Sequence, residues 1–327
     1  MAYDAVTLND IELRLSELAS GTGLFYKKTL WKDDITPLSA ENLNKIEDCL
    51  EAATDVLVSQ GAMTMRERTL NFTNFEYAYF SFTGSSISFF PSTKNATRMG
   101  YCFASCQNLL EFPETLSFEK CTNANSFANN CKKVAQPDSF YFPNMTHCAS
   151  MFYNCERFNG PIEVYIPKAK YIPSMFAGCN YITSAKFTFN TTSAKDSMDG
   201  VFSSCWNLET CEFENMYGFV TAVRAFYDCR KLHTIRGFNM SKFSYGSFIT
   251  NAFFGCSSLI NLEIIGTIQI SINLSDCVNL SVASLLNVLN ALVPTTSTKT
   301  VNFGATNLAK LTEEQIAIGV NKGWTIA

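Results

Sequence analysis

The seven residues FSSCWNL at positions 202–208 return 24 residues later as FYDCRKL at positions 226–232. Both stretches follow the pattern Phe-x-x-Cys-x-x-Leu, which continues along the chain in both directions. The cysteines that align on it, here called the ladder cysteines, are Cys106, Cys131, Cys155, Cys179, Cys205, Cys229, Cys256 and Cys277. This spacing predicts a solenoid, because so short a unit cannot bury its apolar face without stacking on its neighbours.

Apolar residues flank the ladder cysteines on both sides. Three residues after them stand Leu109, Val134, Phe158, Ile182, Leu208, Leu232, Leu259 and Leu280. Three residues before them stand Phe103, Phe152, Phe176, Phe202, Phe226, Phe253 and Leu274, with one exception. In the second repeat Phe127 lies four residues before Cys131, which predicts a local insertion of one residue.

The segment after the motif alternates between apolar and polar residues, as in KFTF at 186–189 and CEFE at 211–214. Such alternation is typical of half-buried strands, so each coil is expected to add one strand to a parallel sheet. The predicted fold class is a β-rich α/β solenoid. It is a leucine-rich-repeat-like parallel β stack of about eight coils of about 24 residues, with an N-terminal helical anchor and a helical C-terminal cap.

Four regions follow from the position of the repeats. Residues 1–65 are expected to form a helical attachment and oligomerisation segment, and residues 66–94 a β-rich linker or N-terminal cap. Residues 95–280 hold the repeats. Residues 281–327 are expected to form the C-terminal cap, with a helix after Ser281, a strand at 299–303 and a capping box formed by Thr312 and Gln315.

The ladder cysteines are best explained by packing. A buried thiol behaves as a small apolar group that fits a narrow interior turn. Zinc sites need close cysteine pairs or histidine partners, whereas these cysteines stand 21 to 27 residues apart. We therefore expect buried, reduced thiols with no metal and no cofactor, although stacked coils would bring adjacent cysteines within the reach of a disulfide.

The repeated unit resembles the BspA-type leucine-rich repeat, a family of bacterial surface and host-contact proteins. The resemblance rests on eight occurrences of the cysteine-centred motif over about half of the chain. It implies an interaction scaffold and not an enzyme, because members of this family are generally adhesive or recognition modules. It implies nothing about the ligand.

The N-terminal region follows a different pattern. Leu43, Ile46, Leu50, Ala53 and Leu57 are spaced by three and four residues in turn, as in a coiled-coil seam. A helix that packs on its own domain would show the same pattern over so short a stretch. We expect a homo-oligomer, a homotrimer in particular, although these five residues do not select three strands over two.

Residues 31–47 resemble the start of many tailed-bacteriophage fibre and baseplate proteins, which include receptor-binding proteins. The similarity lies in the order of Trp31, Pro37, the helix-capping Ser39 and the Leu-Asn-Lys-Ile run at 43–46. In those families this stretch leads from a virion-attachment segment into a helix. The chain departs from them at Asp48, where a glycine is usual, and this departure leaves the helix free to continue.

Composition excludes several classes of function. The chain has 327 residues, of which 47% are hydrophobic and 17% charged, and its net charge is −4. This charge attracts neither nucleic acid nor an anionic membrane surface. No uninterrupted apolar stretch approaches the roughly 18 residues of a membrane span, so no membrane insertion is expected. Asp4, Asp10 and Glu12 stand where a signal peptide would be basic and then apolar, so no export by that route is expected.

The sequence offers little for catalysis. His147 and His233 are the only histidines, and neither belongs to a known nucleophile or metalloprotease motif. Glu163, Glu212 and Glu263 lie on different coils and could in principle supply a glycoside-cleaving carboxylate pair. We therefore expect no catalytic residues and no enzymatic activity.

The two resemblances together imply a bacteriophage structural protein of the tail-fibre or receptor-binding type. It would be made in the host cytoplasm, attach to other virion structural proteins by its N-terminus, and present the repeats to the host cell. The alternatives are a head fibre or decoration protein, a bacterial surface adhesin, and a polysaccharide depolymerase on a solenoid. The missing signal peptide argues against the adhesin.

Recognition is expected to use outward-facing strand positions, where a host cell-surface glycan or protein would bind. Four charged residues, Lys186, Glu212, Arg236 and Glu263, stand seven residues after a ladder cysteine. Tyr165 adds an aromatic ring that could stack on a sugar. The alternative is a solvated face that keeps the rod soluble.

Overall fold

The computed structural model describes residues 93–94, 96–114, 116–190, 196–244 and 249–327. The expected helical segment 1–65 and nearly all of the linker 66–94 lie outside the described residues. So do the five expected oligomerisation residues from Leu43 to Leu57. Among the described helices, none combines the length and the hydrophobicity that a membrane span requires.

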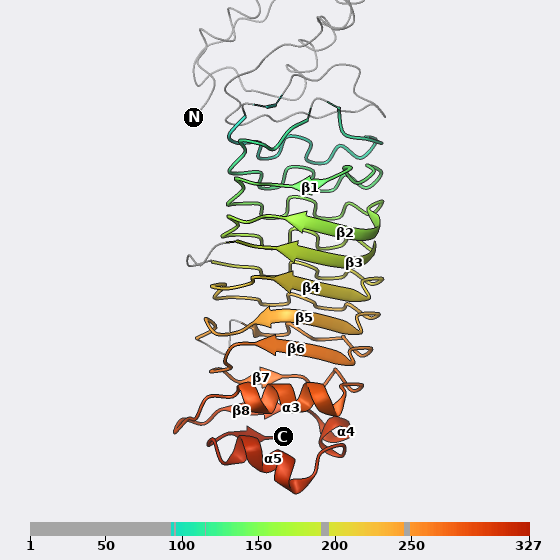
Figure 1. The fold of residues 1–327 in the computed structure, drawn as a ribbon. Coiled ribbons are helices and arrows are strands. Elements are labelled where there is room, and N and C mark those ends of the chain that lie inside the picture. Colours follow the sequence, from blue (N-terminus) through green and yellow to red (C-terminus); the bar gives the residue numbers. More distant parts are fainter. Residues whose placement is uncertain (1–92, 95, 115, 191–195, 245–248) are drawn as a thin grey trace, which may run out of the picture.

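The described chain is an elongated stack of coils with a parallel sheet along one side (Figure 1). Six strands lie in sequence order within this sheet. They are β1 (Phe140–Tyr141), β2 (Asn159–Tyr165), β3 (Tyr181–Thr188), β4 (Thr210–Glu214), β5 (Thr234–Asn239) and β6 (Asn261–Ile265). Buried and exposed residues alternate along β2, β4 and β6. The predicted β-rich fold with a parallel sheet is confirmed.

Behind the sheet runs a second stack built from backbone turns (Figure 1). In the coil of Cys179, the N–H groups of alternate residues from Ile172 to Gly178 donate to carbonyl groups of the next coil, at 2.7 to 3.0 Å. The same arrangement recurs from coil to coil. It requires positive φ angles five residues and one residue before every ladder cysteine except Cys277, for example at Arg224 and Asp228 before Cys229.

Short polar residues or glycine fill most of these positive-φ positions. Asn130 and Asn154 stand one residue before their ladder cysteines, and Gly178 holds the same place in the next coil. Asparagine and glycine tolerate the left-handed conformation best among the residues. These residues therefore determine the course of the turn stack, which the apolar pattern alone does not reveal.

The ladder cysteines lie inside the rod and donate hydrogen bonds. Cys205 Sγ lies 3.1 Å from the carbonyl oxygen of Phe176 in the preceding coil, and Cys229 Sγ lies 3.0 Å from that of Phe202. The twelve described cysteines are all buried free thiols. No cluster of potential metal ligands occurs among the described residues. The thiols thus fill the interior and also bind the backbone of a neighbouring coil.

The predicted insertion near Phe127 is wrong. Cys155 Sγ donates to the carbonyl oxygen of Ala128, at 3.2 Å, so Ala128 occupies the place that phenylalanine holds in other coils. The Phe103 N–H donates to Phe127 just as the Ala128 N–H donates to Met151. The backbone register of the turn stack is therefore unbroken. Phe127 takes the place that the aliphatic Met151 holds in the next coil, so only the side chain differs.

Phenylalanine rings form a continuous column through the core. Ring centroids in this column lie 5.6 to 6.1 Å apart, with interplanar angles of 12 to 24°. The column consists of Phe152, Phe176, Phe202, Phe226 and Phe253. Rings from the sheet meet it edge-on, as Phe187 does against Phe202 at 5.6 Å. Each coil therefore packs mainly on its two neighbours.

The C-terminal cap contains the expected elements. Helix α3 (Val282–Ala291) begins after Ser281, whose side chain accepts a hydrogen bond from the Ser284 N–H. Helix α5 (Glu313–Val320) begins with the capping box of Thr312 and Gln315. The expected strand is β8 (Thr300–Asn302), which pairs with β7 (Ile272–Asn273) and β9 (Thr325–Ile326). The short helix α4 (Ala305–Leu308) was not predicted.

Helix α3 closes the open edge of the six-stranded sheet. Its Ser284 hydroxyl accepts the Leu262 N–H at 2.9 Å, and the Asn287 side chain accepts the Ile264 N–H at 2.8 Å. Asn287 also donates to the Ile264 carbonyl at 3.3 Å. Because side chains replace a strand partner, β6 exposes little backbone for pairing with another sheet.

Candidate functional site

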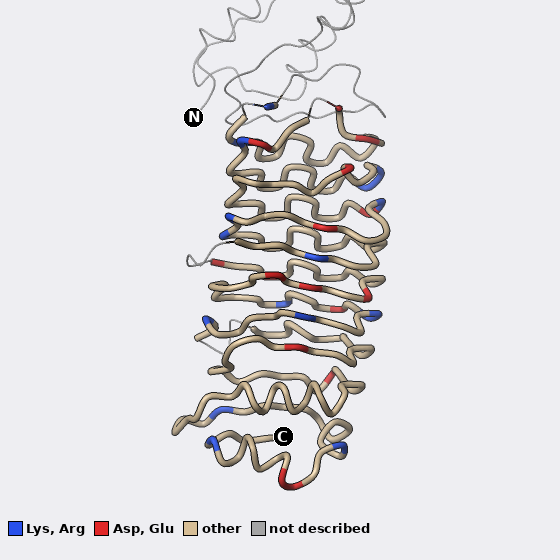
Figure 2. Tube along the Cα trace, in the orientation of Figure 1, with Lys and Arg blue, Asp and Glu red and all other residues tan. Residues whose placement is uncertain are grey.

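The outward face of the sheet carries a single row of alternating charges. Lys186 pairs in register with Glu163 on one side and with Glu212 on the other. Arg236 lies opposite Glu212, and Glu263 follows Leu262, the partner of Ile235. Figure 2 shows the alternating signs down the sheet. The structure therefore places the four predicted charged residues in one row.

Most charges in this row are balanced by an opposite charge on a neighbouring strand. Opposite charges on neighbouring strands attract each other across about 4.8 Å. Lys186 also forms an ion pair with Glu214, with 2.7 Å between Nζ and Oε1. This contact raises the pKa of Lys186 and lowers that of Glu214, so both stay charged at neutral pH. Most of the row therefore resembles the solvated face that was the alternative expectation.

Glu163 belongs to the row but was not among the predicted binding residues. It stands eight residues after Cys155, whereas Lys186 stands seven after Cys179. Strand β2 carries a register shift between Gly160 and Pro161. A fixed count of seven residues from the ladder cysteine therefore misses Glu163 in this coil.

Tyr165 forms a stack with Tyr141 on the preceding strand. Their ring centroids lie 5.0 Å apart and the rings are nearly parallel, at 8°. Tyr141 is 56% exposed and Tyr165 is 37% exposed. Because Tyr165 covers one face of Tyr141, the exposed part of Tyr141 must be its other face and its edge. The sequence holds a signal for this pair that the prediction missed, since both tyrosines stand ten residues after a ladder cysteine.

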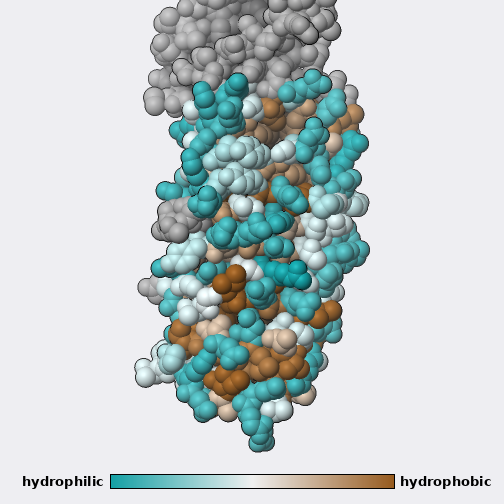
Figure 3. Space-filling model, in the orientation of Figure 1, coloured by the Kyte–Doolittle hydropathy of each residue, from teal (hydrophilic) through white to brown (hydrophobic). Residues whose placement is uncertain are grey.

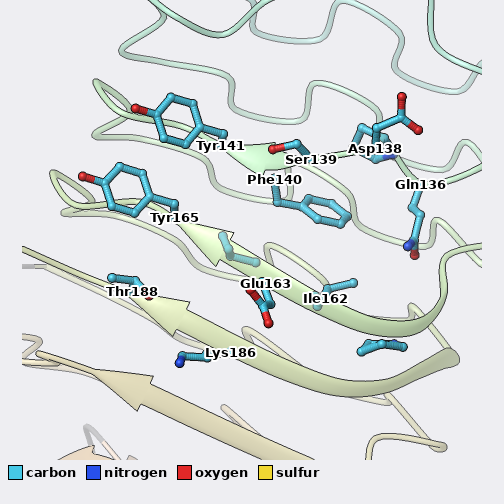
Figure 4. Close-up of a pocket in the computed structure, with 13 residues that line it drawn as sticks. Gln136, Asp138, Ser139, Phe140, Tyr141, Ile162, Glu163, Tyr165, Lys186 and Thr188 are labelled. Carbon is cyan, nitrogen blue, oxygen red and sulfur yellow. The ribbon is translucent and has the colours of Figure 1, made fainter.

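The tyrosine pair borders a groove at the N-terminal end of the sheet (Figure 4). The groove has a volume of about 430 Å³ and is also lined by Gln136, Asp138 and Glu163. It exists because β1 pairs with only the last two residues of the seven-residue strand β2. The Gln136 side chain accepts the Asn159 N–H at 3.2 Å and so bridges the gap. The space lies within the range of about 300 to 1,000 Å³ that small-molecule sites occupy.

The two carboxylates of this groove differ from Lys186 in their contacts. Asp138 and Glu163 are exposed, and neither forms an ion pair or hydrogen bond with the described residues. Lys186 also lines the groove but is engaged by Glu214. The groove therefore has a net negative charge, which the charge row as a whole does not suggest.

The other predicted binding residues lie elsewhere on the sheet. Glu212, Arg236 and Glu263 sit on β4 to β6 and do not line this groove. Arg236 and Glu263 border a smaller hollow of about 290 Å³ between the sheet and α3. Only Tyr165 and Lys186 of the predicted set meet in the tyrosine groove.

Each histidine contacts the hydroxyl of the threonine beside it in the sequence. His233 Nδ1 lies 3.2 Å from the Thr234 hydroxyl and its Nε2 lies 3.9 Å from Glu209. His147 Nδ1 lies 2.9 Å from the Thr146 hydroxyl. Both are half-buried and neither lines the tyrosine groove.

The C-terminal end of the same face is more apolar than the middle (Figure 3). Ile260 just before β6 and Ile265 at its end are each 44% exposed, and Val282 at the start of α3 is 37% exposed. The tyrosine groove and this apolar end therefore occupy opposite ends of the sheet.

Comparison with known proteins finds one similar family. The family described as "Mycoplasma protein of unknown function, DUF285" matches residues 71–188 and 97–215. These matches cover less than half of the chain, and the description assigns the family no function. No curated protein and no solved structure matches the chain. The chain is thus similar over residues 71–215 to a family whose description gives no function.

Proposed function

We propose that the protein is a non-enzymatic recognition module that binds a cell-surface glycan through the outward face of its sheet. The observation that carries this proposal is the groove beside the stacked Tyr141 and Tyr165. Tyrosine contributes a large apolar surface and a phenolic hydroxyl to a binding site. Sugars present both apolar C–H faces and hydroxyl groups, so they suit such a surface.

The architecture supports a scaffold of this kind. The proposed solenoid has about eight coils of about 24 residues, of the leucine-rich-repeat type. Stacked coils hold side chains on successive strands about 4.8 Å apart in a rigid array. Sites on rigid strands hold their geometry better than sites on loops.

The virion role is part of the same proposal. The N-terminal 1–65 segment anchors a homotrimer to other virion structural proteins, and the repeats point towards the host. The resemblance of residues 31–47 to phage fibre proteins supports this assignment. A head fibre or decoration protein would use the same surface.

A polysaccharide depolymerase is the enzymatic alternative. Glu163 and Glu212 flank Lys186 on the sheet, about 9.6 Å apart if adjacent strands are about 4.8 Å apart. Inverting glycosidases hold their carboxylates about 6.5 to 9.5 Å apart to admit the attacking water, but they do so in a concave site that surrounds the sugar. Glu163 is exposed and Glu212 is half-exposed, on an open sheet face. This openness favours binding over cleavage.

Adsorption tests the recognition role. Purified full-length protein is incubated with cells of the strain in which it occurs, and bound protein is measured after washing. Saturable binding that the isolated envelope polysaccharide competes away is the expected result. No binding to the cells or to the polysaccharide would refute the proposal, and new reducing ends on the polysaccharide would establish the depolymerase.

Electron microscopy tests the virion role. Antibodies against residues 96–327 are applied to phage particles purified from the same strain. Label at the tail tip supports receptor binding, and label on the capsid supports a head fibre. Unlabelled particles would contradict a virion location.

A further inference from the structure

We propose that the tyrosine groove, lined by Gln136, Asp138, Tyr141, Glu163 and Tyr165, binds non-acidic sugar rings, neutral or amino, and rejects acidic ones. This inference rests on the proposed recognition function and specifies its ligand. It concerns the N-terminal end of the sheet alone, and the rest of the charge row takes no part in it.

The shape of the groove provides the first argument. The tyrosine rings lie at one end of the hollow and Gln136 and Asp138 at the other, with Glu163 between them (Figure 4). A sugar ring can thus lie with C–H groups against the tyrosine pair while its hydroxyls reach the polar end. The volume of about 430 Å³ admits a short oligosaccharide more readily than a peptide helix.

Hydrogen-bonding capacity provides the second argument. Ionised carboxylates are acceptors only, and each can accept bonds from two neighbouring hydroxyls. Asp138 and Glu163 have this capacity free, because neither has a hydrogen bond or an ion pair with the described residues. The Ser139 and tyrosine hydroxyls can donate as well as accept. This set matches the mixed donors and acceptors of a sugar.

Charge provides the third argument and gives the selectivity. The ion pair with Glu214 engages the only basic residue of the groove, Lys186. Glu163 still faces Lys186 in register, but it shares that lysine with Glu214, so the charged lining residues Asp138, Glu163 and Lys186 leave the groove with a net negative charge. A uronic acid or a phosphorylated sugar would be repelled, whereas an ammonium group would be attracted to both the carboxylates and the tyrosine rings.

Binding of three defined tetrasaccharides to the full-length protein tests the inference, with saturation-transfer NMR as the readout. The probes are cellotetraose, a fully deacetylated chitosan tetramer and tetragalacturonate, which are neutral, basic and acidic respectively. We expect both of the first two to bind at least tenfold more tightly than tetragalacturonate. Equal or tighter binding of tetragalacturonate would overturn the inference, and so would no binding of any probe at millimolar concentration.

Variants assign the binding to the groove. Tyr141→Ala should weaken binding of cellotetraose at least tenfold. Tyr181→Ala is the matched control, because Tyr181 is 59% exposed on the neighbouring β3 and does not line the groove. The double variant Asp138→Asn and Glu163→Gln should bring tetragalacturonate within about threefold of cellotetraose. Equal losses in the two tyrosine variants, or unchanged selectivity in the double variant, would place binding elsewhere.

The cell-binding assay separates this inference from the proposed function. If Tyr141→Ala adsorbs to cells as well as the unchanged protein, recognition stands and the groove is not its site. If the unchanged protein binds cellotetraose but not cells, the groove assignment stands and the recognition role falls. Circular dichroism confirms that each variant is folded.

Discussion

Cys205 Sγ lies 3.1 Å from the carbonyl oxygen of Phe176, and both atoms are buried in the rod. The two residues belong to successive coils, so the contact ties each turn to the one before it. The sequence predicted a thiol that only fills space, and by that reasoning a serine would lack a partner. The structure supplies that partner.

The first prediction concerns substitution of Cys205. Cys205→Ser should lower the free energy of unfolding by about 1 kcal/mol or less, because its hydroxyl can donate to the Phe176 carbonyl. Cys205→Leu should cost about 2 to 3 kcal/mol, because the close-packed interior has no room for the larger side chain. Urea denaturation of both variants measures the difference. A serine variant less stable than the leucine variant would contradict the hydrogen-bonding role.

The second prediction concerns alkaline pH. Burial raises the pKa of Cys205 from 9.0 to about 12. Above pH 9 the unfolded thiol loses its proton while the folded thiol keeps it, so stability falls as pH rises towards 12. The slope is about 1.4 kcal/mol per pH unit for each such thiol. Thermal unfolding between pH 7 and 10.5 should show a shallower loss in Cys205→Ala than in the unchanged protein, and identical slopes would refute the prediction.

The third prediction concerns the sheet edge. Asn287→Ala removes both hydrogen bonds to Ile264 and should destabilise the protein by about 2 kcal/mol. The control is Asn290→Ala, which changes an exposed residue of the same helix and should stay within about 0.5 kcal/mol. Denaturant unfolding measures both. The Asn287 variant should also self-associate more, because the β6 edge becomes available, and light scattering would detect this.

The fourth prediction concerns two glycines with positive φ. A Cβ on Gly237 would clash with the Phe213 carbonyl oxygen, whereas a Cβ on Gly160 would meet nothing within 4 Å. Gly237→Ala should therefore cost about 3 kcal/mol and Gly160→Ala only about 1 kcal/mol of backbone strain. Similar losses of thermal stability in the two variants would contradict the prediction that Gly237 is the more costly position.

The fifth prediction concerns the N-terminal segment. The full-length protein should be a homotrimer, and deletion of residues 1–60 should leave a folded monomer. The expectation rests on the three-and-four spacing of Leu43, Ile46, Leu50, Ala53 and Leu57. Light scattering at micromolar concentration measures both states. A monomeric full-length protein would remove the basis for a trimeric fibre.

The repeat and its strands could be predicted because they depend on side-chain patterns that recur at a fixed spacing. The turn stack could not, because it depends on backbone conformation at residues as different as Ser174, Gly200 and Arg224. The predicted insertion at Phe127 was wrong for the same reason. The phenylalanine of the side-chain pattern moves by one residue there, but the backbone register does not.

The candidate site was predicted only in part for a related reason. Lys186 and Tyr165 followed from the repeat, but the groove arises where the repeat is broken, at the short strand β1. Asp138 also stands seven residues after Cys131, but the prediction did not include it, and its position before β1 takes it out of the charge row. Deviations from a repeat are local, and a periodic pattern carries no information about them.

The turn stack also gives the rod an electrical polarity. In the coil of Cys179, four peptide groups direct their N–H bonds towards the next coil, and neighbouring coils repeat this orientation. Each peptide contributes about 3.5 D, so these four add about 14 D along the axis if they are aligned, and the N–H groups of Lys170 and Tyr171, which donate to Thr146 of the preceding coil, offset part of this. The positive end is the C-terminal one, where the Asp276 carboxylate accepts the Gly255 N–H at 3.2 Å. The rod should therefore orient in an applied electric field, with a dipole moment that grows with each coil.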